Sequence, residues 1–164
     1  MALFNLSGKI KFLLFDLHGV VLPSEGTTGT DRAFSALKAD LQKAEKLGLM
    51  CGVISASEDI SLLQKVKDLG LKEVFSHSID KVSQAEILLK KYNLGYENIG
   101  FVGDDILDIP LLMKSGFSAA PRGARREVKR IVNYVTKDSE EKTVLSDVLD
   151  MISKAREQQA NESK

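Results

Sequence analysis

The stretch IKFLLFD, residues 10–16, decides the fold class, because it is a nearly unbroken apolar run that ends in an aspartate. A strand with one wet face alternates apolar and polar residues, whereas a strand covered on both faces is apolar throughout. We therefore predict that residues 10–15 form a central strand of a parallel sheet. Asp16 then lies at the carboxyl end of that strand.

Apolar segments of strand length alternate with segments of helical period along the rest of the chain. Strands are predicted at 50–54, 73–76, 98–102, 117–119 and 132–135. Helices are predicted at 31–47, 81–92, 106–114 and 144–152. Two more are predicted, one that Ser57 caps and one that begins at 124. This alternation is typical of an α/β fold: a three-layer Rossmann-like parallel sheet with helices on both faces. The apolar stripe stops near Ala155, so we predict one domain over residues 1–155 and a frayed tail at 156–164.

The composition excludes several classes of protein. Of 164 residues, 43% are hydrophobic and 28% charged, which suits a packed core rather than a disordered chain. The 23 basic and 23 acidic residues cancel, so no overall positive field favours nucleic acid or an anionic membrane. No apolar run approaches the length of a membrane helix. The single cysteine, Cys51, lies among apolar neighbours and is predicted to be a buried thiol, as suits a reducing cytoplasm.

Polar residues follow the predicted strands at the edge where an open parallel sheet binds its ligands. Asp16 follows the first strand, Ser55 the second and the pair Asp104 and Asp105 the fourth, while Lys81 opens the helix after the third. Clustered carboxylates repel one another unless a cation lies between them, and their hard oxygen atoms suit Mg²⁺. A lysine and a hydroxyl beside that ion suit a phosphate group.

Each of these residues also has an ordinary structural interpretation when taken alone. Asp16 and the aspartate pair are compatible with helix or turn caps, Ser55 with a turn, and Lys81 with a solvated side chain. All of them, however, fall at strand ends in one order. We therefore interpret them together as one site.

The same residues match four short motifs, and through them the chain resembles the haloacid dehalogenase superfamily of phosphatases. The motifs are FDLHGVV at 15–21, VISA at 53–56, Lys81 alone, and VGDDILDIP at 102–110, which is the most specific. The resemblance covers residues 10–150. Within the superfamily the chain looks most like the small 3-deoxy-D-manno-octulosonate 8-phosphate phosphatases and related sugar phosphatases.

The resemblance implies a covalent mechanism and a role for each residue. It makes Asp16 the nucleophile toward phosphorus, with Mg²⁺ held by Asp16, Asp104 and the backbone carbonyl of His18. Phosphate would be bound by Lys81, Ser55 and the backbone N–H groups near Gly19 and Ala56. Asp108 and Asp105 would orient the metal's water or the lysine from behind.

The spacing of the motifs leaves no room for a cap domain. One helix, one strand and a loop fill the interval from Asp16 to Ser55, and another helix and strand fill that from Ser55 to Lys81. In the resembling family, the neighbouring subunits of a homotetramer close such an open site. We therefore expect a homo-oligomer, a tetramer by that resemblance, with contacts through the loop at 17–30.

His18 departs from the family pattern, which has a second aspartate at this position as proton carrier. An imidazole titrates near neutrality, so His18 is able to act as acid and base in its place. The other interpretation is a non-catalytic replacement in a weakened or inactive relative.

A second departure concerns the substrate, which the resemblance makes a small phosphorylated sugar acid or similar metabolite. The chain has KDSEEKT at 137–143 where the family has a Gly-Gly-Arg-Gly-Ala run. Arg122 follows the fifth strand and is a candidate for binding an anionic substrate, although such basic clusters are more often solvated helix starts.

Two classes of function stay open, a Mg²⁺-dependent phosphatase and a catalytically silent module that keeps the metal and phosphate pocket. A phospho-acceptor receiver domain is disfavoured, because the order of the acidic residues along the chain is reversed.

Overall fold

The computed structural model describes residues 2–24, 26, 29–137, 139 and 141–164 of the chain. Its centre is a six-stranded parallel sheet with the strand order β3-β2-β1-β4-β5-β6. The strands are β1 (Phe12–Phe15), β2 (Met50–Ile54), β3 (Glu73–Phe75), β4 (Ile99–Val102), β5 (Phe117–Ala120) and β6 (Tyr134–Val135). All six lie where the sequence predicts strands, with ends that shift by at most two residues.

Strand β1 lies between β2 and β4, and its register fixes where the polar strand ends meet. Phe12 lies alongside Met50 and Ile99, and three residues later Phe15 lies alongside Val53 and Val102. The chain builds outward from β1 to β3, then returns to the other side of β1 for β4. This reversal is the switch point at which open α/β sheets form their ligand crevices.

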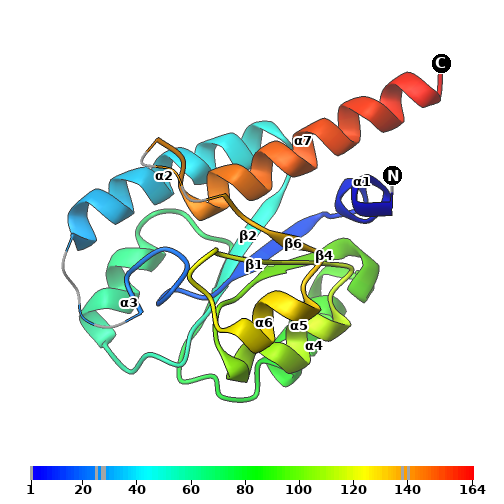
Figure 1. The fold of residues 1–164 in the computed structure, drawn as a ribbon. Coiled ribbons are helices and arrows are strands. Elements are labelled where there is room, and N and C mark those ends of the chain that lie inside the picture. The colour runs from blue at the N-terminus through cyan, green and yellow to red at the C-terminus, as the bar shows by residue number, and fades with distance from the viewer. Residues whose placement is uncertain (1, 25, 27–28, 138, 140) are drawn as a thin grey trace.

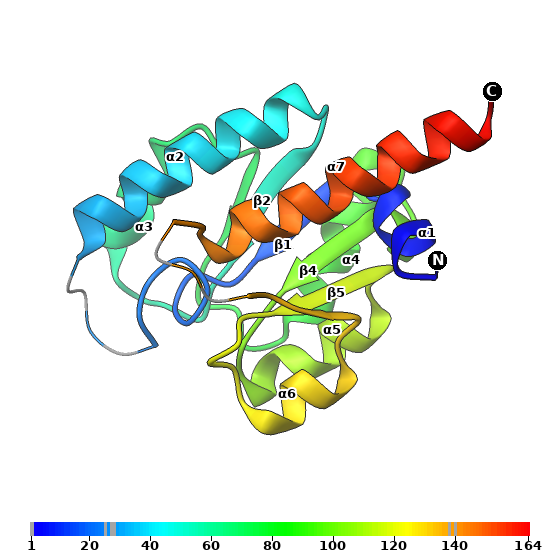
Figure 2. The same cartoon turned by 45° about the horizontal axis from the view of Figure 1, so that its top comes forward.

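Helices cover both faces of the sheet, as Figures 1 and 2 show. The two core clusters place α2, α3 and α7 against one face and α4, α5 and α6 against the other. Two short 3-10 helices, η1 and η2, precede β4 and α5. The bounds of all helices are α1 (Ala2–Gly8), α2 (Thr30–Lys46), α3 (Ile60–Lys67), α4 (Lys81–Tyr92), η1 (Tyr96–Asn98), η2 (Ile106–Asp108), α5 (Ile109–Lys114), α6 (Arg126–Ile131) and α7 (Val144–Glu162).

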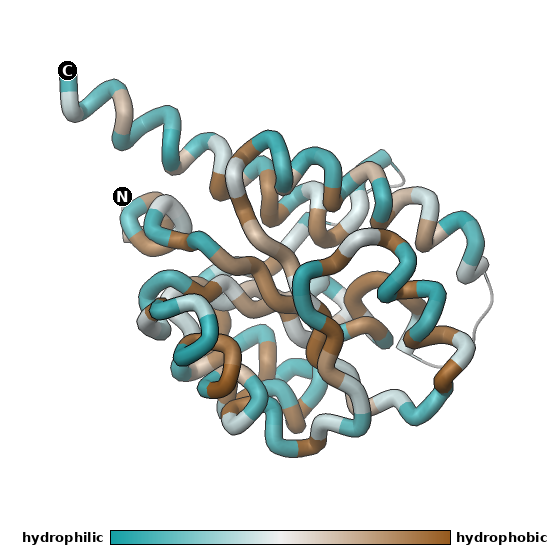
Figure 3. Tube along the Cα trace, turned by 180° about the vertical axis from the view of Figure 1, so that it is seen from behind, coloured by the Kyte–Doolittle hydropathy of each residue, from teal (hydrophilic) through white to brown (hydrophobic). Residues whose placement is uncertain are grey.

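The side chains of β1 divide between the two cores, as expected of a strand buried on both faces. Leu13 and Phe15 join the core beneath α2 and α7, while Phe12 and Leu14 join the core beneath α4 and α5. All four are at most 1% exposed. In Figure 3 the strands form a brown interior surrounded by helices with teal outer faces. The three-layer α/β prediction is therefore confirmed.

The intervals between the motif residues contain only the elements that the sequence predicts. From Asp16 to Ser55 the described residues form a loop, α2 and β2, and from Ser55 to Lys81 they form α3 and β3. Residues 25, 27 and 28 of the predicted oligomer loop, and 138 and 140 of the 137–143 segment, lie outside the described residues. The fold thus has no cap domain in its described part. Cys51 is buried, as predicted.

Two predicted helix boundaries differ from the structure. Helix α3 is capped by Asp59, whose side chain accepts a hydrogen bond from the Leu62 N–H, whereas the Ser57 hydroxyl accepts one from the Asp59 N–H. The predicted helix at 106–114 is divided into η2 and α5, because Asp105 caps a tight 3-10 turn first. Pro110 lies in the first turn of α5, where its missing N–H costs no hydrogen bond.

The C-terminal segment differs from the predicted frayed tail at 156–164, because α7 continues to Glu162. It packs beside α1, an element that sequence periodicity does not indicate (Figure 2). Ala155 is fully buried, and Arg156 donates hydrogen bonds to the carbonyl oxygens of Leu47 and Ile10, the latter at 2.7 Å. These contacts, rather than an apolar stripe, extend the helix. In the described part of the chain, no helix combines the length and apolarity needed to cross a bilayer.

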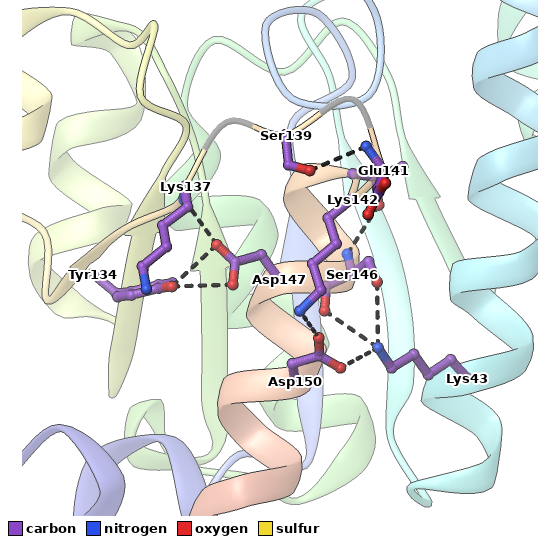
Figure 4. Close-up of polar contacts among 10 residues, drawn as sticks. Lys43, Tyr134, Lys137, Ser139, Glu141, Lys142, Ser146, Asp147 and Asp150 are labelled. Atoms are coloured by element: carbon purple, nitrogen blue, oxygen red, sulfur yellow. Dashed lines mark hydrogen bonds and ion pairs between the residues drawn. The ribbon is translucent and has the colours of Figure 1, made fainter.

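The start of α7 is held by two carboxylates (Figure 4). Asp147 accepts hydrogen bonds from the Tyr134 hydroxyl and, at 2.8 Å, from the Lys137 N–H. Asp150 forms ion pairs with Lys43 of α2 and with Lys142. Lys137 and Lys142 of the 137–143 segment are therefore tied to the helix that follows them.

We expect Arg156→Ala to lower the free energy of unfolding by about 1 to 3 kcal/mol, because it leaves the Leu47 and Ile10 carbonyl groups without their charged donor. Urea denaturation of the variant measures this loss. Lys154→Ala, at an exposed position two residues earlier in the same helix, serves as the control and should change stability by less than about 0.5 kcal/mol. Equal effects of the two substitutions would contradict the anchoring role.

Candidate active site

Four strand ends bring the predicted site residues to one edge of the sheet. The Asp16 N–H donates to the Val102 carbonyl at 3.0 Å, and the Ser55 N–H donates to the Phe75 carbonyl at 2.8 Å, so both residues extend the strand ladder. Lys81 is the first residue of α4, after an Asp80 cap. Because the strands are parallel, these positions face the same crevice.

Three carboxylates converge at this edge. Asp16, Asp104 and Asp108 each offer an oxygen atom, and these atoms lie within 4.8 Å of one another. Asp16 and Asp104 are half-buried and Asp108 is fully buried. Asp16 and Asp104 follow β1 and β4, the two strands that flank the switch point, and Asp108 is the last residue of η2. Such a set of hard oxygen donors with an open side fits a divalent cation such as Mg²⁺.

Lys81 lies against two of these carboxylates. Its Nζ atom is 2.8 Å from Asp16 Oδ2 and 2.5 Å from Asp108 Oδ1, and its side chain is only 3% exposed. Burial alone would lower the pKa of Lys81, but the two carboxylates outweigh it and raise the pKa above its usual value. Lys81 is therefore a fixed positive charge at all ordinary pH values.

Asp108 organises the loop that carries Asp104. Its Oδ2 atom accepts hydrogen bonds from the N–H groups of Asp104 at 3.0 Å and Asp105 at 3.1 Å, while Oδ1 binds Lys81. A Cβ atom on Gly103 would lie 2.7 Å from this side chain, so only glycine fits there. These bonds occupy the Asp108 carboxylate and fix the Asp104 backbone.

The turn after Asp16 brings the chain close to Asp104. Asp16 Oδ1 accepts a hydrogen bond from the Leu17 N–H at 2.7 Å. Two backbone hydrogen bonds then close a tight loop: the Gly19 N–H donates to the Leu22 carbonyl, and the Leu22 N–H donates to the Leu17 carbonyl. Gly19 has a φ of +85°, and a Cβ atom there would overlap the Asp104 carboxylate. The Gly19 N–H itself already donates to the Leu22 carbonyl at 2.8 Å, and phosphate binding by backbone N–H groups near Gly19 stays a prediction.

These residues surround a cavity of about 170 Å³. Ser55 is almost fully buried in its wall, and its hydroxyl accepts the Ser57 N–H at 3.0 Å. Half-buried His18 also lines it. The complete lining is Asp16, His18, Ser24, Ser55, Ala56, Ser57, Lys81, Asp104, Asp105, Leu107 and Asp108.

The cavity differs from the sequence prediction in two respects. Neither the exposed Arg122 nor Arg125 is part of the lining, but Arg125 contacts a lining residue, with its Nε 3.5 Å from Asp105 Oδ1. Ser24 and Ser57 were not predicted. The basic cluster after the fifth strand signals an arginine here but does not say which one.

Burial and mutual repulsion raise the pKa values of two carboxyl groups. The pKa of Asp16 rises to about 6, first because of burial and then because of the nearby Asp108 charge, although Lys81 opposes both. The pKa of Asp104 rises to about 7, again mainly through burial and then through the charges of Asp16 and Asp108. Without a cation, this cluster therefore holds protons near neutral pH, which is the behaviour of a site built for a positive ion.

Comparison with known proteins assigns the chain to a family. The sequence model of the haloacid dehalogenase-like hydrolases matches residues 57–149, more than half of the chain. The chain belongs to this family of hydrolases. Lys81, Asp104 and Asp108 lie inside the matched region, whereas Ser55 lies just before it and Asp16 well before it.

Named relatives of the hydrolase share most of its length. A 3-deoxy-D-manno-octulosonate 8-phosphate phosphatase of Haemophilus influenzae is 26% identical over 155 residues, covering 90% of this chain and 85% of that protein. The protein of the same name from Escherichia coli K12 is 26% identical over 152 residues, covering 88% and 79%.

Solved structures show the same fold. A probable YrbI family phosphatase from Pseudomonas syringae superposes with a TM-score of 0.81 at 22% identity, covering 99% of this chain and 96% of that one. A 3-deoxy-D-manno-octulosonate 8-phosphate phosphatase from Moraxella catarrhalis, crystallised with magnesium ion, phosphate ion and KDO, gives 0.78 at 19% identity, covering 99% and 98%. At these identities the comparison confirms the architecture of the hydrolase.

We expect Gly19→Ala to weaken Mg²⁺ binding by about tenfold or more, because the added methyl group displaces the Asp104 carboxylate. Isothermal calorimetry measures the affinity. Gly48→Ala is the matched control, since Gly48 has a similar φ of +70° with nothing within 4 Å of an added Cβ. Both variants carry the left-handed strain of about 1 to 2 kcal/mol, but only Gly19→Ala should lose metal affinity. Equal metal affinities would contradict the close approach.

We expect the Mg²⁺ affinity to rise about tenfold or more from pH 6 to pH 8, because protons compete with the ion for Asp104 and Asp16. In the metal-free protein, the stability of the fold changes in the opposite direction: the free energy of unfolding falls as the pH rises. A carboxyl group whose folded pKa is raised stabilises the fold only at low pH, and this stability is lost as pH rises from about 4 to about 7. Urea denaturation in EDTA, compared with Asp104→Asn, isolates this contribution; a parallel pH profile of the two proteins would contradict it.

Proposed function

We propose that this hydrolase is a Mg²⁺-dependent phosphomonoesterase that acts through an aspartyl-phosphate intermediate. The convergence of the Asp16, Asp104 and Asp108 oxygen atoms within 4.8 Å, with Lys81 against Asp16, is the observation that carries the proposal. An anionic nucleophile beside a fixed ammonium and a cation site suits attack on a charged phosphoryl group.

The residues fit the metal, since the donors are carboxylates and the nearest cation, Lys81, leaves one side of the cluster open to the cavity. We assign Mg²⁺ to Asp16, Asp104 and the backbone carbonyl of His18. Bound there, it would neutralise charge on the phosphoryl oxygens and on the nucleophile. Asp108 is a positioning residue in this proposal, because its own oxygen atoms bind Lys81 and two backbone amides.

The covalent step uses Asp16 as the nucleophile. A carboxylate oxygen of Asp16 forms a bond to phosphorus while the bond from phosphorus to the leaving alkoxide breaks, and the alkoxide takes a proton. Water then attacks phosphorus, loses a proton and releases Asp16 with inorganic phosphate. The bonds to Leu17 and Lys81 hold the carboxylate in one orientation before the reaction.

Three further residues would bind the phosphoryl oxygens. Lys81 supplies a positive charge, Ser55 a hydroxyl group in the cavity wall, and Ala56 a backbone N–H beside the same cavity. The Gly19 N–H is not among these donors, because it donates to the Leu22 carbonyl. Asp105, which lines the outer part of the cavity, would orient the metal's water or the lysine without binding the metal itself.

His18 is the residue on which turnover depends in this proposal. It lines the cavity two residues after the nucleophile, where it is able to give a proton to the leaving group and take one from water. The replacement of the family's aspartate by histidine at this position is also the reason for the alternative function, a weakly active or inactive homologue that keeps metal and phosphate binding for sensing or assembly. Loss of acid–base help typically lowers a rate by about 10² to 10⁴.

The substrate in this proposal is a small phosphorylated sugar acid or a similar metabolite. It is supported by the relatives named 3-deoxy-D-manno-octulosonate 8-phosphate phosphatases. A homotetramer and a cytoplasmic location stay predictions from the resemblance.

We expect p-nitrophenyl phosphate to be hydrolysed with Mg²⁺ and not in EDTA. Asp16→Asn should abolish the reaction, because an amide is not a nucleophile toward phosphorus. His18→Asp should raise the rate by restoring a carboxyl proton carrier, and His18→Asn should lower it. A steady-state assay with release of p-nitrophenolate measures all four proteins.

The assay separates the two functions. Phosphate and Mg²⁺ binding by calorimetry, with no turnover on a panel of phosphomonoesters, supports the silent homologue. An unchanged or lower rate in His18→Asp argues against a proton-transfer role at this position. Full activity in Asp16→Asn would overturn the covalent mechanism.

A further inference from the structure

Arg125 lies at the rim of the cavity and is fixed to the loop that carries the site carboxylates. Its backbone N–H donates to the Asp104 carbonyl at 3.0 Å, and it is the capping residue of α6. Its Nε atom lies 3.5 Å from Asp105 Oδ1, and Asp105 lines the cavity. The backbone contact limits how far the guanidinium is able to move from the cavity mouth.

The cavity needs a second cation if its substrate carries a second negative charge. Among its lining residues Lys81 is the only lysine or arginine, and it already contacts Asp16 and Asp108. In the proposed reaction, the remaining capacity of Lys81 goes to the phosphoryl group. A carboxylate elsewhere on the substrate would face the aspartates alone, unless a rim residue neutralised it.

The ion pair between Arg125 and Asp105 is easily exchanged. The side chains are 65% and 52% exposed, and pairs this exposed contribute about 0 to 1 kcal/mol. A guanidinium has five N–H donors, and Asp105 contacts Nε alone. Within the described residues, no other acceptor bonds to this side chain, so its outer edge is available to a ligand.

We propose that Arg125 is a specificity-determining residue that binds a carboxylate on the substrate, at the end remote from the phosphoryl group. The inference rests on the proposed phosphatase function and adds to it the residue that selects among phosphomonoesters. A guanidinium pairs with a carboxylate through two parallel hydrogen bonds, which lysine cannot reproduce. In this proposal the substrate carboxylate replaces Asp105 as the partner of Arg125.

Two neighbouring arginines provide matched controls. Arg122 and Arg126 are exposed, carry the same charge and belong to the same short segment. The Arg122 carbonyl accepts a hydrogen bond from Lys129. None of the three arginines is in the cavity lining, but within the described residues only Arg125 forms an ion pair with a lining residue, Asp105. A general effect of positive charge near the site would appear in all three positions, whereas carboxylate recognition belongs to Arg125 alone.

The test compares 6-phosphogluconate with sorbitol 6-phosphate, which has a hydroxymethyl group in place of the carboxylate. We expect the wild type to prefer 6-phosphogluconate in kcat/KM, and Arg125→Gln to reduce this preference about tenfold, mainly through a higher KM. Arg125→Lys should restore part of it, while Arg122→Gln and Arg126→Gln should keep it. Mg²⁺ affinity should stay unchanged in Arg125→Gln, because the backbone N–H to Asp104 is retained.

Hydrolysis of p-nitrophenyl phosphate distinguishes the failure of this inference from failure of the proposed function. If it is hydrolysed equally by the wild type and Arg125→Gln, but the preference between the two sugar phosphates is absent or survives the substitution, the inference is wrong. If it is not hydrolysed at all, the proposed function fails. Calorimetric measurement of the affinity of both sugar phosphates for the same variants then decides the role of Arg125. A selective loss of affinity for 6-phosphogluconate in Arg125→Gln supports the role, and equal affinities for the two sugar phosphates contradict it.

Discussion

The ion pairs of Lys81 with Asp16 and Asp108 are the interaction on which the rest of the site depends. Three charged groups from the ends of β1, α4 and η2 meet in a nearly dry environment, where the Lys81 side chain is 3% exposed and that of Asp108 is 0% exposed. Removing one partner of a buried pair typically costs about 3 to 5 kcal/mol, because the other charge is left buried and unpaired. The arrangement therefore fixes the relative positions of the elements that carry it. One ammonium nevertheless faces more carboxylates than it neutralises, which leaves the cluster short of positive charge.

The hydrogen bonds of Asp108 confine the excess negative charge to the open side of the carboxylate cluster. One of its oxygen atoms takes Lys81 and the other takes two backbone amides, so its charge is fully hydrogen-bonded inside the protein. Within the described residues the Asp104 carboxylate accepts no comparable hydrogen bonds, and its pKa rises to about 7 through burial and then through the other carboxylates, although Lys81 opposes the rise. The uncompensated charge thus faces the cavity, where a cation is able to reach it. The glycines at 19 and 103 let the two loops approach closely enough for this to happen.

The sequence predicts this site well where a residue's position follows from the strand pattern. Asp16, Ser55 and Asp104 each follow a buried strand, and parallel strands end at one edge, so their convergence needs no knowledge of side-chain packing. Periodicity does not indicate contacts made by single polar groups. Helix α7 extends past Ala155 because Arg156 binds two carbonyl oxygens and because α1 lies beside it, and neither feature produces an apolar stripe. Likewise the competition of the Leu22 carbonyl for the Gly19 N–H, and the choice of Arg125 over Arg122, depend on loop geometry.

The buried residues proposed for phosphoryl chemistry and the more exposed residues at the cavity mouth also differ in how much the fold constrains them. The groups proposed for phosphoryl chemistry, Lys81 and Ser55, are buried and make hydrogen bonds that hold loops together, so their replacement disturbs the structure as well as the reaction. His18 and Arg125 lie at the cavity mouth, half-buried or exposed, and the fold depends little on their side chains. Selection for a different leaving group or proton donor is therefore able to act on these positions at little cost in stability. Substitutions at His18 and Arg125 are therefore expected to change proton transfer or substrate preference while the fold and the buried phosphoryl site stay intact.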